Sequence, residues 1–543
     1  MDKNYSRLGD VENMCHEYVD KPPYNFSDKG LYGNYRCDAP PFLLDQTINM
    51  MKDMEANPDF ILWTGDNLPH TKTSPEWDVV YEEIKSITDR LRRAFPETQI
   101  LPCIGNRDLS PVNVIDPRKS SRSIYEGFLD KAGWHELLNK SKGFEEETFT
   151  RGGYYSVSVS SSLRVITLNS NLWYKKNNYT TRRRDPARQL QWLENVLNES
   201  YTNEQQVYII GHIPPGFYSK AIPKKKGEQM YHEHFMQPLL MILRRYSEII
   251  KGQFYGHFHL DMFQIFRYAT GSIKGFALLA PSMSPWYEEK NSTLSVPVNP
   301  GVRLITYSRR DSVVSDYTQY YLDLEKANDE ESGAYLPLYT FSKIYDVTEI
   351  SSDSLNKVYN NLKKDQNLFE TFYNLLTVGK KSLPCNNNCK VSQLCSMFSY
   401  TLKDYEKCTG LSNIIVEKSF FDKSVNYLLF YVSLLLLILT ACVLFYLLYS
   451  TFCSDSKNMA KKTSTKTLDS IEGWQQLRLH IQDRPGFLRI SFSGSMNVVK
   501  PSVSAVGVNS GHSKICFGLS DWISGQSLYC MDLVSSEWIF MPL

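Results

Sequence analysis

An uncharged apolar stretch near the C-terminus limits most strongly what this chain can fold into. No charged residue occurs from Val425 to Ser454, and the middle of the stretch reads YLLFYVSLLLLILTACVLFYLLYS. That length exceeds the roughly 20 apolar residues with which a helix crosses a bilayer. A buried core helix is the alternative, but core helices rarely stay apolar on every face over so many turns. The stretch therefore predicts one transmembrane helix over residues 425–450.

The charges that flank the stretch predict its orientation. Asp422 and Lys423 precede it, and four lysines follow it: Lys457, Lys461, Lys462 and Lys466. Because cytosolic flanks carry the excess of lysine and arginine, residues 1–424 should face the cell exterior or an organelle lumen. The expected location is therefore the plasma membrane or an endolysosomal membrane. Residues 451–543 would form a cytosolic tail of unassigned role, or a spurious extension of the gene prediction.

A different anchor stays open. If the tail is spurious, an apolar stretch that ends the chain could be a glycosylphosphatidylinositol signal, removed after attachment at Ser419 or Ser424. The charged tail that follows the stretch favours a true membrane span.

Sequons and cysteines agree with an exported N-terminal part. All six Asn-x-Ser/Thr sequons precede the apolar stretch, at Asn4, Asn25, Asn139, Asn178, Asn198 and Asn291. Such sequons are glycosylation acceptors on surfaces of secretory-pathway proteins. Seven of the eleven cysteines also precede the stretch, and four of them lie between Cys385 and Cys408. This cluster predicts a disulfide-linked subdomain, with a zinc knuckle as the less favoured alternative in an oxidising compartment.

Composition excludes a disordered chain and gives no sign of nucleic-acid binding. The chain is 42% hydrophobic, enough for a large core, and its formal net charge is +1. A charge so near zero creates no field that would attract nucleic acid along the whole chain. We also expect the chain to be a monomer. The basic runs Arg182–Arg184 and Lys224–Lys226 are interpreted as solvated loops, although either could attract a phosphate group.

Strand-like and helix-like segments alternate over residues 1–330. Short apolar runs (DFILW, QILPCI, RVITL, VYII and GQFY) end in loops that carry polar residues. Between them, helical spacing follows Ser74-Pro75-Glu76 and Asp185-Pro186. This alternation predicts a layered α/β domain whose site lies on the loops after the strands. Residues 331–424 become helical and end in the cysteine cluster, which predicts a small helical C-terminal subdomain.

Five polar residues at the strand ends are candidate metal ligands: Asp66, Asn106, His212, His257 and His259. A glycine directly precedes each of the first four and permits a tight turn. A single such histidine is usually a core residue, but five at successive strand ends predict a metal site. Two divalent cations about 3.5 to 4 Å apart, bridged by one carboxylate, can direct a hydroxide at phosphorus. Asp66 would be the bridge, and imidazoles with a carboxylate favour zinc over manganese or iron.

His257 and His259 are separated by one residue. On an extended segment their rings would point to opposite faces unless a turn reorients them. We therefore expect the two histidines to serve different metals.

The order GD, GN-x-D, GH, GH-x-H resembles the calcineurin-like metallophosphoesterase superfamily. The segments WTGDNLPH, NPGVRL, DPARQLQWLE, YIIGHIPPG and GQFYGHFHLD, with the cysteine cluster, narrow the resemblance to the acid sphingomyelinase-like phosphodiesterases over about residues 2–412. The resemblance implies a β-sandwich flanked by helices, two zinc ions, and the disulfides Cys15–Cys37, Cys385–Cys389 and Cys395–Cys408, with Cys103 unpaired. No saposin-type domain is visible, which favours nucleotide substrates over sphingomyelin-like phospholipids.

The start of the sequence departs from the family pattern. The family has an Asp-x-His-x-Asp motif after its first strand, and Met1-Asp2-Lys3-Asn4-Tyr5 is similar to the end of that motif. We therefore expect the first strand, two ligands of one metal and a signal peptide to lie upstream of Met1. The alternative is a degenerate relative that keeps a single metal.

A second departure concerns the leaving group. Arg107 stands where the family motif has a histidine that helps the leaving group depart. An arginine stays charged and can donate to phosphate, but it is a poor proton donor. His70, in GDNLPH, matches a second histidine associated with leaving-group protonation, so it is the expected general acid.

The sequence thus predicts a membrane-tethered ectoenzyme that hydrolyses phosphodiester or phosphoanhydride bonds with a metal-bound hydroxide. The alternative is a catalytically weakened membrane protein that binds lipid or a partner and regulates signalling. Arg107 and the missing ligands favour that alternative.

Overall fold

The computed structural model describes residues 1–17, 28–71, 73–118, 121–219, 228–268, 271–287, 296–380, 384–410 and 430–447, and five strands between Arg478 and Pro542. The sequons at Asn25 and Asn291, the basic run Lys224–Lys226, and Ser419 and Ser424 lie outside these residues. The chain divides into two compact units, Met1–Leu429 and Phe430–Leu543, and each is described separately.

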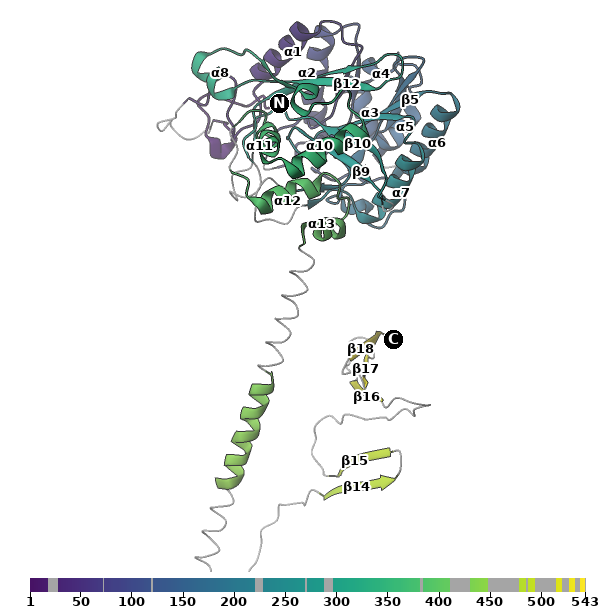
Figure 1. The fold of residues 1–543 in the computed structure, drawn as a ribbon, viewed down its shortest axis with the longest axis vertical. Coiled ribbons are helices and arrows are strands. Elements are labelled where there is room, and N and C mark those ends of the chain that lie inside the picture. The colour runs from purple at the N-terminus through teal and green to yellow at the C-terminus, as the bar shows by residue number, and fades with distance from the viewer. Residues whose placement is uncertain are drawn as a thin grey trace, which may run out of the picture. The chain divides into compact units, whose positions relative to one another are not determined.

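A six-stranded sheet forms the centre of the first unit (Figure 1). Its strand order is β3-β4-β5-β8-β10-β9. The bounds are β3 Tyr155–Ser158, β4 Leu163–Thr167, β5 Gln206–Ile210, β8 Ile250–Tyr255, β9 Met262–Arg267 and β10 Ile273–Leu279. The four inner strands are parallel, and the outer strands β3 and β9 are antiparallel to their neighbours. Parallel strands are covered on both faces, which explains why the run VYII has no polar alternation.

Three smaller sheets accompany the central one among the described residues of the first unit. Strand β1 (Phe60–Trp63) pairs in parallel with β2 (Gln99–Pro102), and β11 (Gly301–Tyr307), β12 (Val314–Tyr321) and β13 (Leu336–Thr340) form an antiparallel sheet. Strands β6 (Phe217–Tyr218) and β7 (Glu228–Gln229) form a short hairpin. Among the described strands, β1 and β11 each have one paired neighbour, and both line a cavity of about 720 Å³.

Helices surround these sheets. The N-terminal ones are α1 Pro41–Met54, α2 Trp77–Ala94, α3 Arg122–Asp130, α4 His135–Leu138, α5 Glu146–Gly152, α6 Gln189–Thr202 and α7 Glu233–Arg245. Helix α2 begins three residues after Ser74, with Glu76 as its N-cap residue. The segment opened by Asp185 starts as a short 3-10 turn, and the Asp185 carboxylate accepts hydrogen bonds from the backbone N–H groups of Leu190 and Gln191 in α6.

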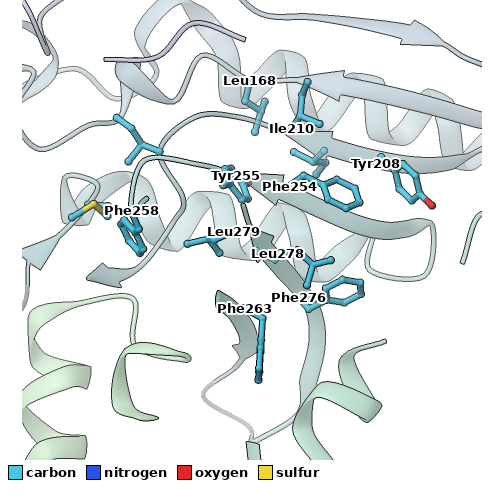
Figure 2. Packing of buried hydrophobic residues seen from close by; sticks show 14 of the residues in the cluster. Leu168, Tyr208, Ile210, Phe254, Tyr255, Phe258, Phe263, Phe276, Leu278 and Leu279 are labelled. Carbon is cyan, nitrogen blue, oxygen red and sulfur yellow. The ribbon is translucent and has the colours of Figure 1, made fainter. Parts of the chain in front are cut away.

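The C-terminal helices pack onto the sheets. They are α8 Leu324–Glu330, α9 Phe341–Tyr345, α10 Ser352–Lys364, α11 Gln366–Leu375, α12 Asn387–Ser396 and α13 Leu402–Thr409. Helix α10 contacts β9 and β10. Figure 2 shows part of the shared core, in which Phe254, Leu278, Phe276 and Phe263 extend from the central sheet. One continuous apolar cluster therefore includes the sheet and the helices that follow it.

Three disulfide bonds link the described cysteines in the pairs that the resemblance implies: Cys15–Cys37, Cys385–Cys389 and Cys395–Cys408. Cys103 is buried and unpaired. The Cys385–Cys389 bond fastens the start of α12, and the Cys395–Cys408 bond joins α12 to α13.

The second unit contains one apolar helix among its described residues. It spans Phe430–Leu447, has a mean hydropathy of 2.5 over 18 residues, and none of that window is buried. Length and composition therefore suit a membrane span, and the helix lies within the predicted range 425–450. The tail, for which the sequence suggested no elements, contains strands β14 Arg478–Arg484, β15 Phe487–Ser493, β16 Lys514–Leu519, β17 Ser527–Asp532 and β18 Trp538–Pro542.

A buried ion pair connects β11 to the segment before β9. Arg303 donates to Asp261, the two side chains are 4% and 1% exposed, and Tyr339 donates to the same carboxylate at 2.6 Å. Because R303M leaves a buried carboxylate without its cation, we expect the free energy of unfolding to fall by about 3–5 kcal/mol. Urea unfolding of the purified protein measures this. The double variant D261N/R303M should recover part of the loss, and an unchanged midpoint in R303M would contradict the prediction.

Candidate metal centre

The five predicted ligands lie at the carboxyl ends of four strands. Asp66 follows β1, Asn106 follows β2, His212 follows β5, and His257 and His259 follow β8. Because β1 and β2 are parallel, and β5 and β8 are parallel, the loops after each pair leave at the same edge.

His212 joins three of the other candidates. Its Nε2 lies 3.0 Å from Asp66 Oδ2, 3.0 Å from Asn106 Oδ1 and 3.2 Å from His257 Nδ1. Ligand atoms of Asp66, His212 and His257 all lie within 4.8 Å of one another. The structure therefore brings four of the five candidates together.

Neighbouring groups orient the ligand atoms. His212 Nδ1 donates to the carbonyl oxygen of Thr64 at 2.7 Å, which leaves Nε2 to face the centre. The Asn106 amide nitrogen donates to Asn113 Oδ1 at 3.0 Å, which leaves its oxygen facing the centre. His212 Nε2 is thus directed at oxygen acceptors on two residues and at a ring nitrogen. Such a convergence of acceptors suits a cation.

Several candidate ligands lie on strained backbone, and their loops approach one another closely. Asp66, His257 and His259 have φ values of 61°, 69° and 59°, in the left-handed region that non-glycine residues rarely adopt. A Cβ at Gly105 would lie 2.2 Å from the backbone nitrogen and Oδ1 of Asp66. Glycine is therefore required there, because the two ligand loops approach too closely for any side chain.

The turn at His257 and His259 separates the two rings. His257 joins His212, whereas the His259 ring lies 6.0 Å from that of His70 and 6.4 Å from Trp286. Both histidines line the cavity of about 720 Å³, together with Asp66 and His212. That the two histidines serve different metals stays a prediction.

Electrostatics keep Asp66, His257 and His259 in metal-binding protonation states. Burial opposes a charge on His212, but the Asp66 carboxylate raises the pKa of His212, so His212 has to lose its proton when Nε2 binds a cation. Burial opposes ionisation of Asp66, but the charge of His212 and its hydrogen bond hold the pKa of Asp66 below its usual range. Burial and the neighbouring His212 charge lower the pKa of His257 well below normal. Burial and His70 lower the pKa of His259 to about 4. A carboxylate with neutral imidazoles is the form that binds a divalent cation.

Asp108, which sequence reasoning did not single out, holds two ligand loops together. Its buried carboxylate accepts from the backbone nitrogens of Asp66 at 3.0 Å, Asn67 at 2.6 Å and Gly105 at 2.8 Å. Burial and the Asp66 charge raise the pKa of Asp108. Asp108 is the last residue of the motif GN-x-D, so the motif could have identified it from the sequence.

The substitution D108N tests this arrangement. It keeps the shape of the side chain but replaces one carboxylate oxygen with an amide N–H₂ group. That group cannot accept a hydrogen bond, so one of the buried backbone N–H donors loses its partner. We expect the free energy of unfolding to fall by about 1–3 kcal/mol, together with weaker zinc binding. Urea unfolding and zinc titration measure the two effects. D45N is the control, because Asp45 is half-buried on α1 and pairs with Arg90 away from the ligand loops. Equal behaviour of the two variants would count against the role of Asp108.

His70 and Arg107 lie on neighbouring loops. His70 lines the same cavity as Asp66 and His259. The Arg107 backbone N–H donates to Asp66 Oδ1 at 2.7 Å, and its Nη2 donates to the carbonyl oxygen of Pro69, next to His70, at 2.7 Å. Arg107 Nε is buried without a partner among the described residues. The guanidinium is therefore fixed against the His70 loop.

Sites predicted for modification lie on the surface where they are described. Asn4, Asn139, Asn178 and Asn198 are exposed, as is the basic run Arg182–Arg184. Exposure permits glycosylation of these asparagines, which stays a prediction.

Comparison with known proteins identifies the family. The family profile "Calcineurin-like phosphoesterase" matches residues 26–261, and the profile "Acid sphingomyelin phosphodiesterase C-terminal region" matches residues 277–414. The chain is 30% identical to acid sphingomyelinase-like phosphodiesterase 3b of Mus musculus, over 75% of this chain and 87% of that protein. It is 33% identical to cyclic GMP-AMP phosphodiesterase SMPDL3A of Rattus norvegicus, over 75% and 89%. It is 31% identical to sphingomyelinase phosphodiesterase C of Dictyostelium discoideum, over 74% and 89%. The chain therefore belongs to the acid sphingomyelinase-like phosphodiesterases, within the calcineurin-like phosphoesterases.

Proposed function

We propose that this chain is a metal-dependent phosphodiesterase that hydrolyses phosphodiester or phosphoanhydride bonds of sphingomyelin-like lipids or of nucleotides. The observation that carries the proposal is the orientation of His212, whose Nε2 faces Asp66, Asn106 and His257 because Thr64 occupies Nδ1. The names of relatives support both substrate classes, since one is a cyclic GMP-AMP phosphodiesterase and another a sphingomyelinase phosphodiesterase.

Asp66, Asn106, His212, His257 and His259 are the residues that would hold the metals. Imidazole, carboxylate and amide donors favour zinc, and two ions are proposed. When bound, such ions supply an activated water and positive charge for the phosphate group. Asp66 is held ionised and the imidazoles of His257 and His259 are held neutral, so no proton has to leave these three side chains before binding.

The chain's own residues supply the remaining chemistry. His70 is proposed to protonate the departing oxygen, because it lines the cavity that contains Asp66 and His259. Arg107, fixed by Pro69, is proposed to donate to a phosphate oxygen, which a permanently charged guanidinium does well.

The apolar helix Phe430–Leu447 is proposed as a membrane anchor, with the catalytic unit on the extracellular or lumenal side. Three disulfide bonds and four exposed sequons support this side of the membrane. Mobility shifts after glycosidase treatment of microsome-protected protein would test the orientation.

Hydrolysis by the purified full chain tests the function. Sphingomyelin, a cyclic dinucleotide and bis(p-nitrophenyl) phosphate are assayed at pH 5 and pH 7, after chelation and after zinc is returned. We expect hydrolysis of at least one substrate that chelation abolishes and zinc restores. Absence of hydrolysis for all three substrates would favour the alternative, a catalytically weakened protein that binds lipid or a partner. Arg107, in place of the motif histidine, supports that alternative.

A further inference from the structure

Two side chains that no motif indicated surround His70. The carboxylate of Asp38 lies 3.0 Å from His70 Nδ1 through Oδ1, and its Oδ2 accepts the His70 backbone N–H at 2.5 Å. The indole of Trp286 stacks on the imidazole with ring centroids 3.5 Å apart and planes inclined by 14°. The ring is therefore held at one edge and on one face.

Asp38 itself is firmly placed. It is 3% exposed, follows the disulfide-bonded Cys37, and accepts from Ser284 Oγ at 3.2 Å. Burial opposes its ionisation, but the charge of His70 and the hydrogen bonds from His70 outweigh burial and lower the pKa of Asp38. An anionic carboxylate thus accepts from Nδ1, so the proton on that nitrogen is fixed.

The orientation of the other ring nitrogen follows from these contacts. Because Nδ1 is bound to Asp38, Nε2 is the nitrogen left to face the cavity that also contains Asp66, His212 and His259. Stacking on Trp286 prevents the ring from turning about its last torsion. A histidine held in this way presents one defined ring nitrogen, Nε2, to a ligand in the cavity.

We propose that Asp38 is a positioning residue for leaving-group protonation, with Trp286 as the wall against which it holds His70. The proposal rests on the function proposed above and adds two residues to it. In the step, the proton on Nε2 moves to the oxygen of the breaking P–O bond, and the released alcohol is neutral. The ring becomes neutral, keeps its Nδ1 proton on Asp38, and regains a proton from solvent.

Leaving-group dependence separates this role from a purely structural one. The full chain is assayed with two phosphocholine esters, one that releases p-nitrophenolate and one that releases an aliphatic alcohol. Nitrophenolate leaves without a proton, whereas an alkoxide needs one. Since general acid catalysis contributes about 10²–10⁴-fold, we expect D38N to lower kcat on the aliphatic ester by roughly 10-fold or more and on the nitrophenyl ester by less than about 3-fold. W286F should also lower kcat more on the aliphatic ester than on the nitrophenyl ester, but by a smaller factor than D38N.

The matched control is E83Q. Glu83 is a buried carboxyl whose partner is Lys3 at 2.7 Å, and it does not line the cavity. This variant should leave both rates unchanged. Equal losses on the two esters in D38N, or no loss on either, would overturn the proposal.

A second measurement does not depend on turnover. In protein labelled with ¹⁵N-histidine, the Nδ1–H resonance of His70, assigned by its absence in H70Q, should be protected from exchange in the wild type and in E83Q. It should lose that protection in D38A. If the wild type hydrolyses neither ester, the proposed function fails while this resonance still decides the role of Asp38, and an unprotected resonance in the wild type refutes it.

Discussion

Replacing His212 with alanine should abolish metal-dependent hydrolysis. Its Nε2 lies within 3.2 Å of atoms from Asp66, Asn106 and His257. The substitution therefore removes the side chain that contacts each of the other three candidate ligands. Loss of an outer contact to a metal ligand lowers affinity or activity by about 10–100-fold, and loss of this ligand should exceed that range. Steady-state kinetics with zinc in excess, and metal content by mass spectrometry, measure the effect.

Fold and metal binding are distinguished by two comparisons. H234A is the control, because His234 is an exposed residue that bonds to the Arg183 carbonyl oxygen and does not line the cavity. It should keep wild-type activity and zinc. H212A also loses the buried contacts of His212 with Thr64 and Asp66, so its midpoint of thermal unfolding without zinc should be lower than that of the wild type. Added zinc should raise the midpoint of the wild type and leave that of H212A unchanged. Full zinc content and turnover in H212A would be incompatible with a metal centre at this position.

Local patterns were enough to predict the ligands because each ligand belongs to a strand and its following turn. Asp66, Asn106, His212 and His257 follow apolar runs that become β1, β2, β5 and β8. The pairing of those strands was not predictable, since an apolar run is compatible with several neighbours. In the structure β1 and β2 form their own sheet, apart from the six-stranded one.

The residues that position His70 escaped prediction for a physical reason. Asp38 and Trp286 meet His70 only in the fold, from segments 32 and more than 200 residues away in the chain. Neither has a local signature, because an aspartate after a cysteine and a tryptophan in a loop are common. His257 and His259 show a further limit, since their positive φ values place them on a turn and not on the extended segment that periodicity describes.

The substitution H70Q should have the second-largest effect, confined to substrates with poor leaving groups. Glutamine can still donate toward Asp38 but cannot release a proton, so the general acid is lost while the wall of the cavity stays. General acids contribute about 10²–10⁴-fold, and we expect a fall of that order in kcat for esters of aliphatic alcohols. Esters of p-nitrophenol should change little. Zinc content should stay at the wild-type level because the ligand trio of Asp66, His212 and His257 does not include His70.

The comparison of kcat losses between aliphatic and nitrophenyl esters shows whether His70 acts as a proton donor. H135Q is a suitable control, since His135 is partly exposed, pairs with Glu146 and lies outside the cavity. Equal losses on both classes of ester, accompanied by loss of zinc, would make His70 a metal ligand or a structural residue. Loss on the aliphatic esters alone, with zinc retained, requires a proton donor at this position. Arg107, which remains charged beside Pro69, cannot replace it, because a guanidinium does not release its proton in the pH range of the assay.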